Sequence, residues 1–134
     1  MSGALSAVPR PLEQQSSPVA IATALADDFS LTAADHDKSG EFAAGNFEAL
    51  FTSGLLGLVT AEKDGGWGEG METAHAVIAA IARGDPSTAL ILAMHYSVHA
   101  AIRRGKWPVA LASRVLAANS REPALLNNAQ AEPG

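Results

Sequence analysis

Two histidines, His95 and His99, have the clearest potential for chemistry in this 134-residue chain. A spacing of four places both imidazoles on one side of a helix, and an imidazole ionises near neutral pH, so the pair suits proton transfer or metal binding. A zinc hydrolase of the HExxH type needs a glutamate directly after the first histidine, and Tyr96 occupies that position. No third metal ligand is identifiable. The pattern therefore favours structural or substrate-facing histidines over a metal site.

A second candidate is the segment DHDKSG at residues 35–40, which is similar to the first half of an EF-hand calcium loop. Asp35, Asp37 and Ser39 supply oxygens at loop positions one, three and five, and Gly40 stands at position six. The twelfth position, where a glutamate should complete the ligand shell, is Asn46. A segment that is acidic only in its first half is more typical of a helix end followed by a polar turn. We therefore expect no bound metal.

The glycine-rich segment DGGWGEG at residues 64–70 raises the possibility of a phosphate-binding loop. It has neither the lysine of a Walker motif nor the G-x-G-x-x-G register, so a turn between helices explains it better. The chain also lacks the nucleophile motifs G-x-S-x-G and S-x-x-K. From these residues alone the chain is a helical domain without an assigned reaction.

The two histidines must be positioned by the stretch at residues 83–105, which has the clearest helix boundaries in the chain. Gly84 is expected to end the preceding helix in a left-handed conformation. Asp85 is a favourable N-cap, Pro86 a favourable first helical residue, and Gly105 a favourable stop. The stretch between these boundaries predicts a helix.

This central helix is apolar on almost every side, which is typical of a helix in the middle of a domain. Its interior polar groups are expected to be four residues only, namely His95, Tyr96, Ser97 and His99.

Hydrophobic periodicity and turn residues predict four further helices, at residues 18–36, 42–53, 71–83 and 107–119. Residues 55–59 form a short apolar run that is extended or irregular, and residues 121–134 a strand-like arm. Residues 1–17 are expected to be a loose tail. About five helices and no convincing sheet predict an all-α fold, an orthogonal helical bundle spanning residues 18–134.

The composition excludes several classes of partner. The formal net charge is −5, and the nine lysines and arginines form no basic stripe, so nucleic acid and anionic membranes are unsuited as partners. The chain has no cysteine, which excludes disulfides and thiolate chemistry. No stretch reaches the roughly 20 apolar residues of a membrane span, and the N-terminus lacks the apolar core of a signal peptide. We therefore expect a cytoplasmic protein.

Several motifs together resemble the N-terminal helical domain of the acyl-CoA dehydrogenase family of flavoproteins. They are GEF-x-x-x-NF-x-x-L-x-x-SGLLGL, the following GGWG, the RGDPSTAL joint between two helices and the closing AEPG. The resemblance covers residues 18–134. The HDKSGEF opening, the pair His95-Tyr96 and NNAQAEP are closer to the branch that includes flavin-dependent monooxygenases of organosulfur compounds. The chain departs from the family in its AEKDGG loop, where a tyrosine is common, and at Ala131, which replaces a threonine close to the flavin.

This resemblance implies a helical domain that packs against a β-domain and a C-terminal helical bundle, with FAD or FMN between them, in a homo-oligomer. His95 would be the polar group nearest the flavin, able to donate a proton in the flavin reaction. Asn128, Gln130 and Ala131 would meet the edge of the flavin ring. The central helix would line the cavity for an acyl-CoA or organosulfur substrate through Ala89, Leu90, Ala93, Met94, Tyr96 and Ser97. Plain core packing remains an alternative for Ala89 and Ala93.

The β-domain, the family's catalytic base and most flavin phosphate contacts are not among these 134 residues. We therefore expect a fragment or truncated form that is inactive and holds no flavin tightly on its own. The parent reaction would be dehydrogenation of an acyl thioester or flavin-dependent monooxygenation. The alternative is a non-catalytic helical interaction domain, whose central helix binds a partner protein.

Overall fold

A computed structural model describes residues 16–127 of the protein. Within this range the chain forms six α-helices and two short 3-10 helices, and no strand. The predicted all-α class is therefore confirmed, with one more α-helix than expected. Residues 1–15 of the predicted tail, and residues 128–134 of the predicted arm, lie outside the described range.

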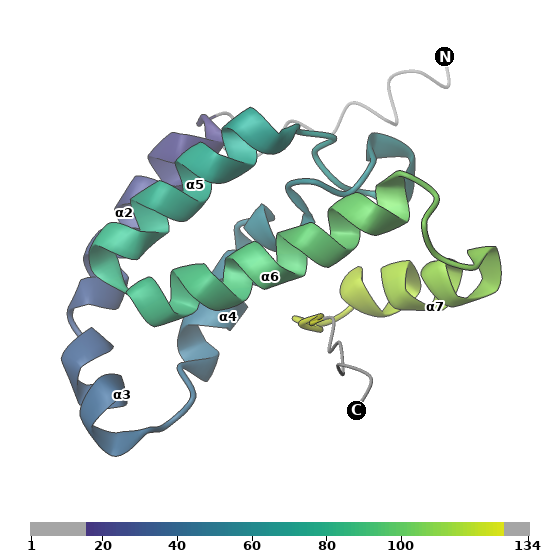
Figure 1. Ribbon diagram of the computed structural model, residues 1–134. Helices are drawn as coiled ribbons and strands as arrows, with labels where there is room; N and C mark the ends of the chain where they lie inside the picture. Colours follow the sequence, from purple (N-terminus) through teal and green to yellow (C-terminus); the bar gives the residue numbers. More distant parts are fainter. Residues whose placement is uncertain (1–15, 128–134) are drawn as a thin grey trace, which may run out of the picture.

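The helices form a layered bundle in which α6 occupies the middle (Figure 1). Helices α2 (Pro18–Ser30) and α5 (Met71–Gly84) lie side by side, and α6 (Pro86–Arg103) follows α5 directly and packs against it. Helix α4 (Ala44–Thr52) crosses behind α6, α3 (Ala33–Ser39) projects at one end, and α7 (Val109–Asn119) lies toward the other. The buried core includes Phe29, Phe47, Leu50, Leu55, Leu56, Leu58, Val77, Ile81, Leu92 and Tyr96.

The single helix predicted over residues 18–36 is in fact two helices, α2 and α3. The start was correct, because Ser17 caps α2 by accepting a hydrogen bond from the Ala20 N–H at 3.1 Å. At the other end the Ser30 hydroxyl donates to the Asp27 carbonyl at 2.6 Å, and the Leu31 N–H donates to the Asp28 carbonyl, three residues back. These local bonds tighten the last turn and end the helix.

Gly84 does not have the left-handed conformation expected of it, since it is the last residue of α5 and its φ is not positive. Its role is steric. A Cβ placed on Gly84 would collide with the backbone of Ala26 on α2. The glycine therefore lets α2 and α5 approach each other closely, which explains their long contact.

The start of α6 is held by a buried carboxylate. Asp85 is 4% exposed, and its Oδ1 accepts hydrogen bonds from the N–H groups of Ser87 and Thr88. Its Oδ2 accepts from the Thr88 hydroxyl at 3.0 Å and from the Asn46 amide of α4 at 3.1 Å. Asp85 is therefore both the predicted N-cap and a bridge between α4 and α6.

The apolar run at residues 55–59 folds as a 3-10 helix, η2 (Leu55–Gly57), and its continuation. Leu55, Leu56, Leu58 and Val59 are all buried. A second 3-10 helix, η3 (Glu62–Asp64), opens the glycine-rich segment. This irregular connection therefore contributes a substantial part of the core.

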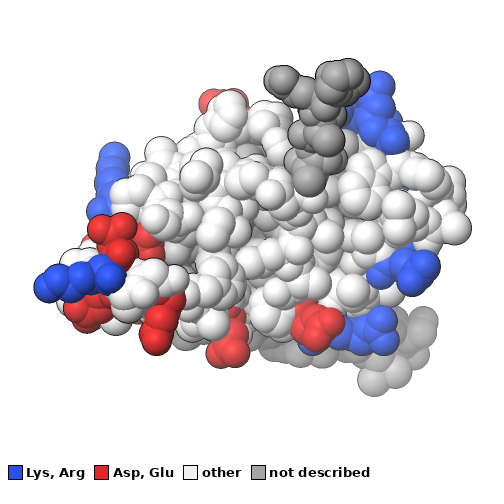
Figure 2. Space-filling model, turned by 60° about the horizontal axis from the view of Figure 1, so that its bottom comes forward, with Lys and Arg blue, Asp and Glu red and all other residues white. Residues whose placement is uncertain are grey.

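Charge is distributed unevenly over the surface. Acidic side chains gather at the end of the molecule formed by α3, whereas lysines and arginines dominate the opposite end (Figure 2). Between these ends lies a broad surface with few charged side chains. None of the helices described in the structure is long and apolar enough to cross a membrane.

Candidate functional site

Helix α6 leaves one apolar face open to solvent. Leu90 is 64% exposed and Met94 37% exposed, Ser97 is also exposed, and Ala93 is half-buried. Steps of three or four residues place these side chains on one side of the helix. We call these four residues the open face of α6. They are four of the six positions predicted to contact substrate.

The other two predicted substrate contacts, Ala89 and Tyr96, lie in the core instead. Ala89 is 3% exposed, and Tyr96 is 1% exposed, with its hydroxyl donating to the Leu55 carbonyl at 2.6 Å. The alternative of core packing, kept open for Ala89, describes its position in this structure. Of the predicted interior polar groups Ser97 is on the surface, whereas Thr88, which was not predicted, is buried.

His95 is fully buried, and both of its ring nitrogens have hydrogen-bond partners. Its Nε2 lies 3.0 Å from the Leu56 carbonyl oxygen of η2, which can only accept. Its Nδ1 accepts from the Leu126 N–H at 3.3 Å. These partners assign the neutral ring with the proton on Nε2.

His99 is 2% exposed and lies against His95, with 4.4 Å between the ring centroids. The Asn119 amide nitrogen donates to the His99 Nε2 at 3.2 Å and also to the Val115 carbonyl, which fixes the amide orientation. The His99 Nδ1 lies 3.3 Å from the Thr60 hydroxyl. His99 is therefore assigned the opposite tautomer, with its proton on Nδ1.

Burial lowers the pKa of both histidines from 6.5 to about 4, and for His99 the neighbouring His95 adds to this effect. Between these values the unfolded chain binds more protons than the folded one, so stability must fall as the pH falls through this window. We expect the free energy of unfolding to drop by about 2 to 4 kcal/mol from pH 7.5 to pH 5, because one pKa unit corresponds to about 1.4 kcal/mol. Urea unfolding at several pH values measures this slope.

His99→Gln should remove about half of the loss. The same substitution at the exposed His75 on α5 serves as the control for the stability at pH 7.5. An unchanged slope in His99→Gln would show that the buried pair does not cause the acid sensitivity.

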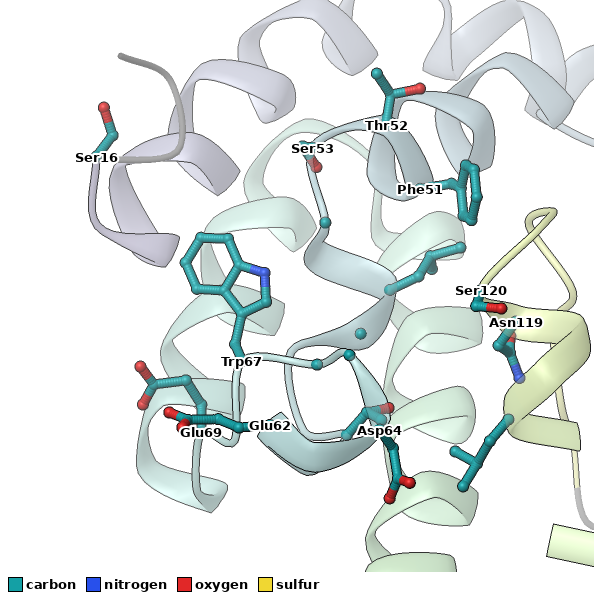
Figure 3. Close-up of a pocket in the computed structure, with 17 residues that line it drawn as sticks. Ser16, Phe51, Thr52, Ser53, Glu62, Asp64, Trp67, Glu69, Asn119 and Ser120 are labelled. Carbon is teal, nitrogen blue, oxygen red and sulfur yellow. The ribbon is translucent and has the colours of Figure 1, made fainter. Parts of the chain in front are cut away.

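A wide hollow of about 1060 Å³ lies beside η2, between the end of α4, the glycine-rich segment and the end of α7 (Figure 3). Trp67 lies along one side, and the Asn119 side chain borders the other. Glu62, Asp64 and Glu69 line its rim. No residue of the open face of α6 lines this hollow. It is therefore separate from the predicted substrate wall.

The glycine-rich segment beside the hollow is a turn, as the sequence favoured. Consecutive N–H groups from Gly65 to Glu69 already donate to backbone carbonyls, for example Trp67 to Gly57 and Gly68 to Thr60. N–H groups that already donate to carbonyls are not available to a phosphate, and the nearby carboxylates would repel it. Gly66 is required because a Cβ there would collide with Thr60.

The segment considered as a calcium loop is helical in the structure. The segment with Asp35, Asp37 and Ser39 forms helix α3, and Gly40 ends it in a left-handed conformation with a φ of 71°. A helix cannot wrap these oxygens around one ion. No group of three or more histidines and carboxylates among residues 16–127 is placed to hold a metal.

Four polar residues of the buried networks were not predicted from the sequence. They are Asn46 and Thr88 beside Asp85, Thr60 beside His99, and Asn119 at the end of α7. The available signal was weak, because asparagine and threonine near helix ends are usually caps or surface residues. The predicted flavin contacts Asn128, Gln130 and Ala131 lie outside the described residues.

The fold and site define an all-α domain with one open apolar helix face and a buried histidine pair behind it. Residues 13–105, more than half of the chain, match the family described as acyl-CoA dehydrogenase, N-terminal domain. The chain belongs to the acyl-CoA dehydrogenase family.

Its relatives include flavin-dependent monooxygenases. A dibenzothiophene monooxygenase of Rhodococcus erythropolis is 38% identical over 78 residues, 58% of this chain and 19% of its own length. A probable FMNH2-dependent monooxygenase, SfnC of Pseudomonas putida, is 34% identical over 103 residues, 77% of this chain and 25% of its own.

A similar solved structure is FMN-bound TdsC from Paenibacillus sp. A11-2, with a TM-score of 0.69 and 28% identity. The match covers 78% of this chain and 26% of that one. The chain thus spans about a fifth to a quarter of the length of these proteins.

Proposed function

We propose that this chain is the N-terminal helical domain of a flavin-dependent monooxygenase of small organosulfur compounds, and that the open face of α6 forms one wall of its substrate cavity. The observation that carries this proposal is the exposure of Leu90 and Met94 on a helix whose other sides are buried. Leaving large apolar side chains in water is unfavourable, and such a face is typical of a binding surface.

The chemistry of this face suits an uncharged sulfur compound. Leu90 and Met94 offer dispersion contacts, and the polarisable thioether of Met94 packs well on aromatic or sulfur-containing molecules. The two sequence relatives named above are monooxygenases, one of them described as FMNH2-dependent, and the similar solved structure contains FMN. These names support monooxygenation over dehydrogenation, and FMN over FAD, in the complete enzyme.

In this proposal the described residues supply one wall of the site, and the flavin is bound mainly by other parts of the complete enzyme. In the complete enzyme FMNH2 would supply two electrons, so that one atom of O₂ is transferred to sulfur and the other leaves as water. The open face would orient the sulfur compound and exclude water from it. Flavin contacts are predicted at Asn128, Gln130 and Ala131, and the isolated chain is expected to bind FMN only weakly.

A domain exchange tests this proposal. The matching segment of the Rhodococcus erythropolis dibenzothiophene monooxygenase would be replaced by this chain, and oxidation of dibenzothiophene would be measured with FMNH2 from a flavin reductase. The chimera should be active. Leu90→Lys should lower kcat/KM at least tenfold, because a charge in an apolar wall is poorly tolerated.

The matched control is Leu31→Lys, the same substitution at a residue that is 79% exposed between α2 and α3. It should leave the activity unchanged. An assembled, FMN-binding chimera that oxidises no organosulfur compound would contradict the proposal. If the two lysine substitutions had equal effects on activity, the open face of α6 would not line the substrate cavity.

The alternative, a non-catalytic interaction domain, is tested by the mass of the native protein in its source cells. An antibody against this chain that detects only a 13.7 kDa species would favour the alternative. A much larger, flavin-containing species would support the enzyme.

A further inference from the structure

The segment at residues 123–127, after α7, has no regular secondary structure and yet is held against α6. The Leu126 N–H donates to the Nδ1 of His95 at 3.3 Å, and Leu125 packs against the core. This segment leads directly to Asn128 and Gln130, two of the predicted flavin contacts. Whatever fixes residues 123–127 also fixes where the following residues begin.

The His95 ring joins this segment to a second irregular one. Its Nε2–H donates to the Leu56 carbonyl of η2, 39 residues earlier, while its Nδ1 accepts from Leu126, 31 residues later. An imidazole is rigid, so its two nitrogens hold these two backbone segments at a fixed separation. The ring thereby acts as a spacer between η2 and residues 123–127.

His99 restricts this ring further. It lies against His95 and is itself held by Thr60 on one side and Asn119 on the other. Asn119 is the last residue of α7, immediately before the chain turns toward residues 123–127. The two histidines therefore connect α6 to η2, to Thr60, to the end of α7 and to the segment after it.

We propose that His95 is a positioning residue, which fixes residues 123–127 against α6 and η2 and so sets the approach of the predicted flavin contacts. Only the effect on the flavin contacts rests on the proposed function; the fixing of residues 123–127 by His95 does not. A proton-donor role would need a free N–H on the ring. Here the only ring N–H donates to the Leu56 carbonyl. A proton on Nδ1 would replace the acceptor of the Leu126 N–H with a second donor, and the two donors would repel each other.

The first test uses the 134-residue chain without substitution. A long-range ¹H–¹⁵N NMR spectrum of the histidine rings at pH 7.5 should show His95 protonated on Nε2 and His99 on Nδ1. A rapidly exchanging mixture of tautomers at His95 would overturn the proposal, because a ring bound at both nitrogens cannot exchange freely.

The second test uses two amide isosteres that each replace half of the ring. In His95→Asn the side-chain oxygen can still accept from Leu126, as Nδ1 does. In His95→Gln the amide can still donate to Leu56, as Nε2–H does. We expect hydrogen exchange of the Leu126 amide to be at least tenfold faster in His95→Gln than in His95→Asn. Equal exchange in both variants at equal stability would overturn the positioning role.

The same pair separates positioning from proton donation in the chimera described above. Neither amide titrates, so a proton-donor role predicts equal loss of kcat in both variants. A positioning role predicts that His95→Asn keeps most of kcat, whereas His95→Gln loses at least tenfold with KM little changed. If the chimera assembles and binds FMN but is inactive, the proposed function fails, while the tautomer and hydrogen-exchange tests still decide the positioning role.

Discussion

Gly84→Ala is expected to destabilise the chain by about 2 to 4 kcal/mol, although alanine is the better helix former. The added Cβ would collide with the carbonyl group and Cα of Ala26 on the neighbouring helix. A backbone cannot rotate away as a side chain can, so α2 and α5 must separate. That separation would loosen the packing of Ala22, Ala26 and Ile81, which are buried along these two helices.

Gly45→Ala is the matched control, because Gly45 also lies in a helix, α4, and an added Cβ there would have no neighbouring atom within 4 Å. This variant should be neutral or stabilising by up to about 1 kcal/mol. Urea unfolding followed by circular dichroism measures both variants. If Gly84→Ala were as stable as Gly45→Ala, the close contact of α2 with α5 would be refuted.

Those helix boundaries that depend on a capping residue could be predicted, because capping involves neighbours in sequence. Ser17 and Asp85 cap their helices, and Gly105 follows α6 with a φ of 72°, as their residue types indicated. The role of Gly84 could not be predicted in the same way. Its partner Ala26 is far away in sequence, and only the packed helices show that no side chain fits between them.

In the candidate site, too, local features could be predicted from the sequence and packing could not. The family resemblance implied a stripe of ligand contacts on α6, and of these residues Leu90 and Met94 are exposed. It could not decide which side of the helix faces the core, because a helix that is apolar on nearly every side has no distinct polar face. Ala89 and Leu90 differ by one residue, yet one is 3% exposed and the other 64%.

The histidine pair shows why spacing alone is a weak guide to chemistry. A spacing of four correctly brought His95 and His99 together. Their function depends on Leu56, Asn119 and Leu126, whose positions follow from the path of the chain around α6. Every ring nitrogen of the pair has a hydrogen-bond partner, so we propose a positioning role for His95 and assign the ligand contacts to the open face of α6.

Asp85→Ala should cost about 2 to 4 kcal/mol in the free energy of unfolding. Loss of an N-cap costs about 1 kcal/mol, and leaving buried polar partners without their acceptor adds about 1 to 3 kcal/mol. The orphaned donors are the Asn46 amide, the Thr88 hydroxyl and the first N–H groups of α6. Asn46 and Thr88 still have each other at 3.0 Å, which limits the loss.

Two variants make this prediction specific to burial. Ser17→Ala removes the exposed cap of α2 and should cost only about 1 kcal/mol, because water can replace the lost acceptor. Asp85→Asn keeps an oxygen for the backbone N–H groups but gives its other side an amide, so its cost should fall between the two alanine variants. Urea unfolding of all three decides the matter. Equal costs for Ser17→Ala and Asp85→Ala would mean that Asp85 is only a cap, and that its bridge from α6 to Asn46 on α4 contributes nothing to stability.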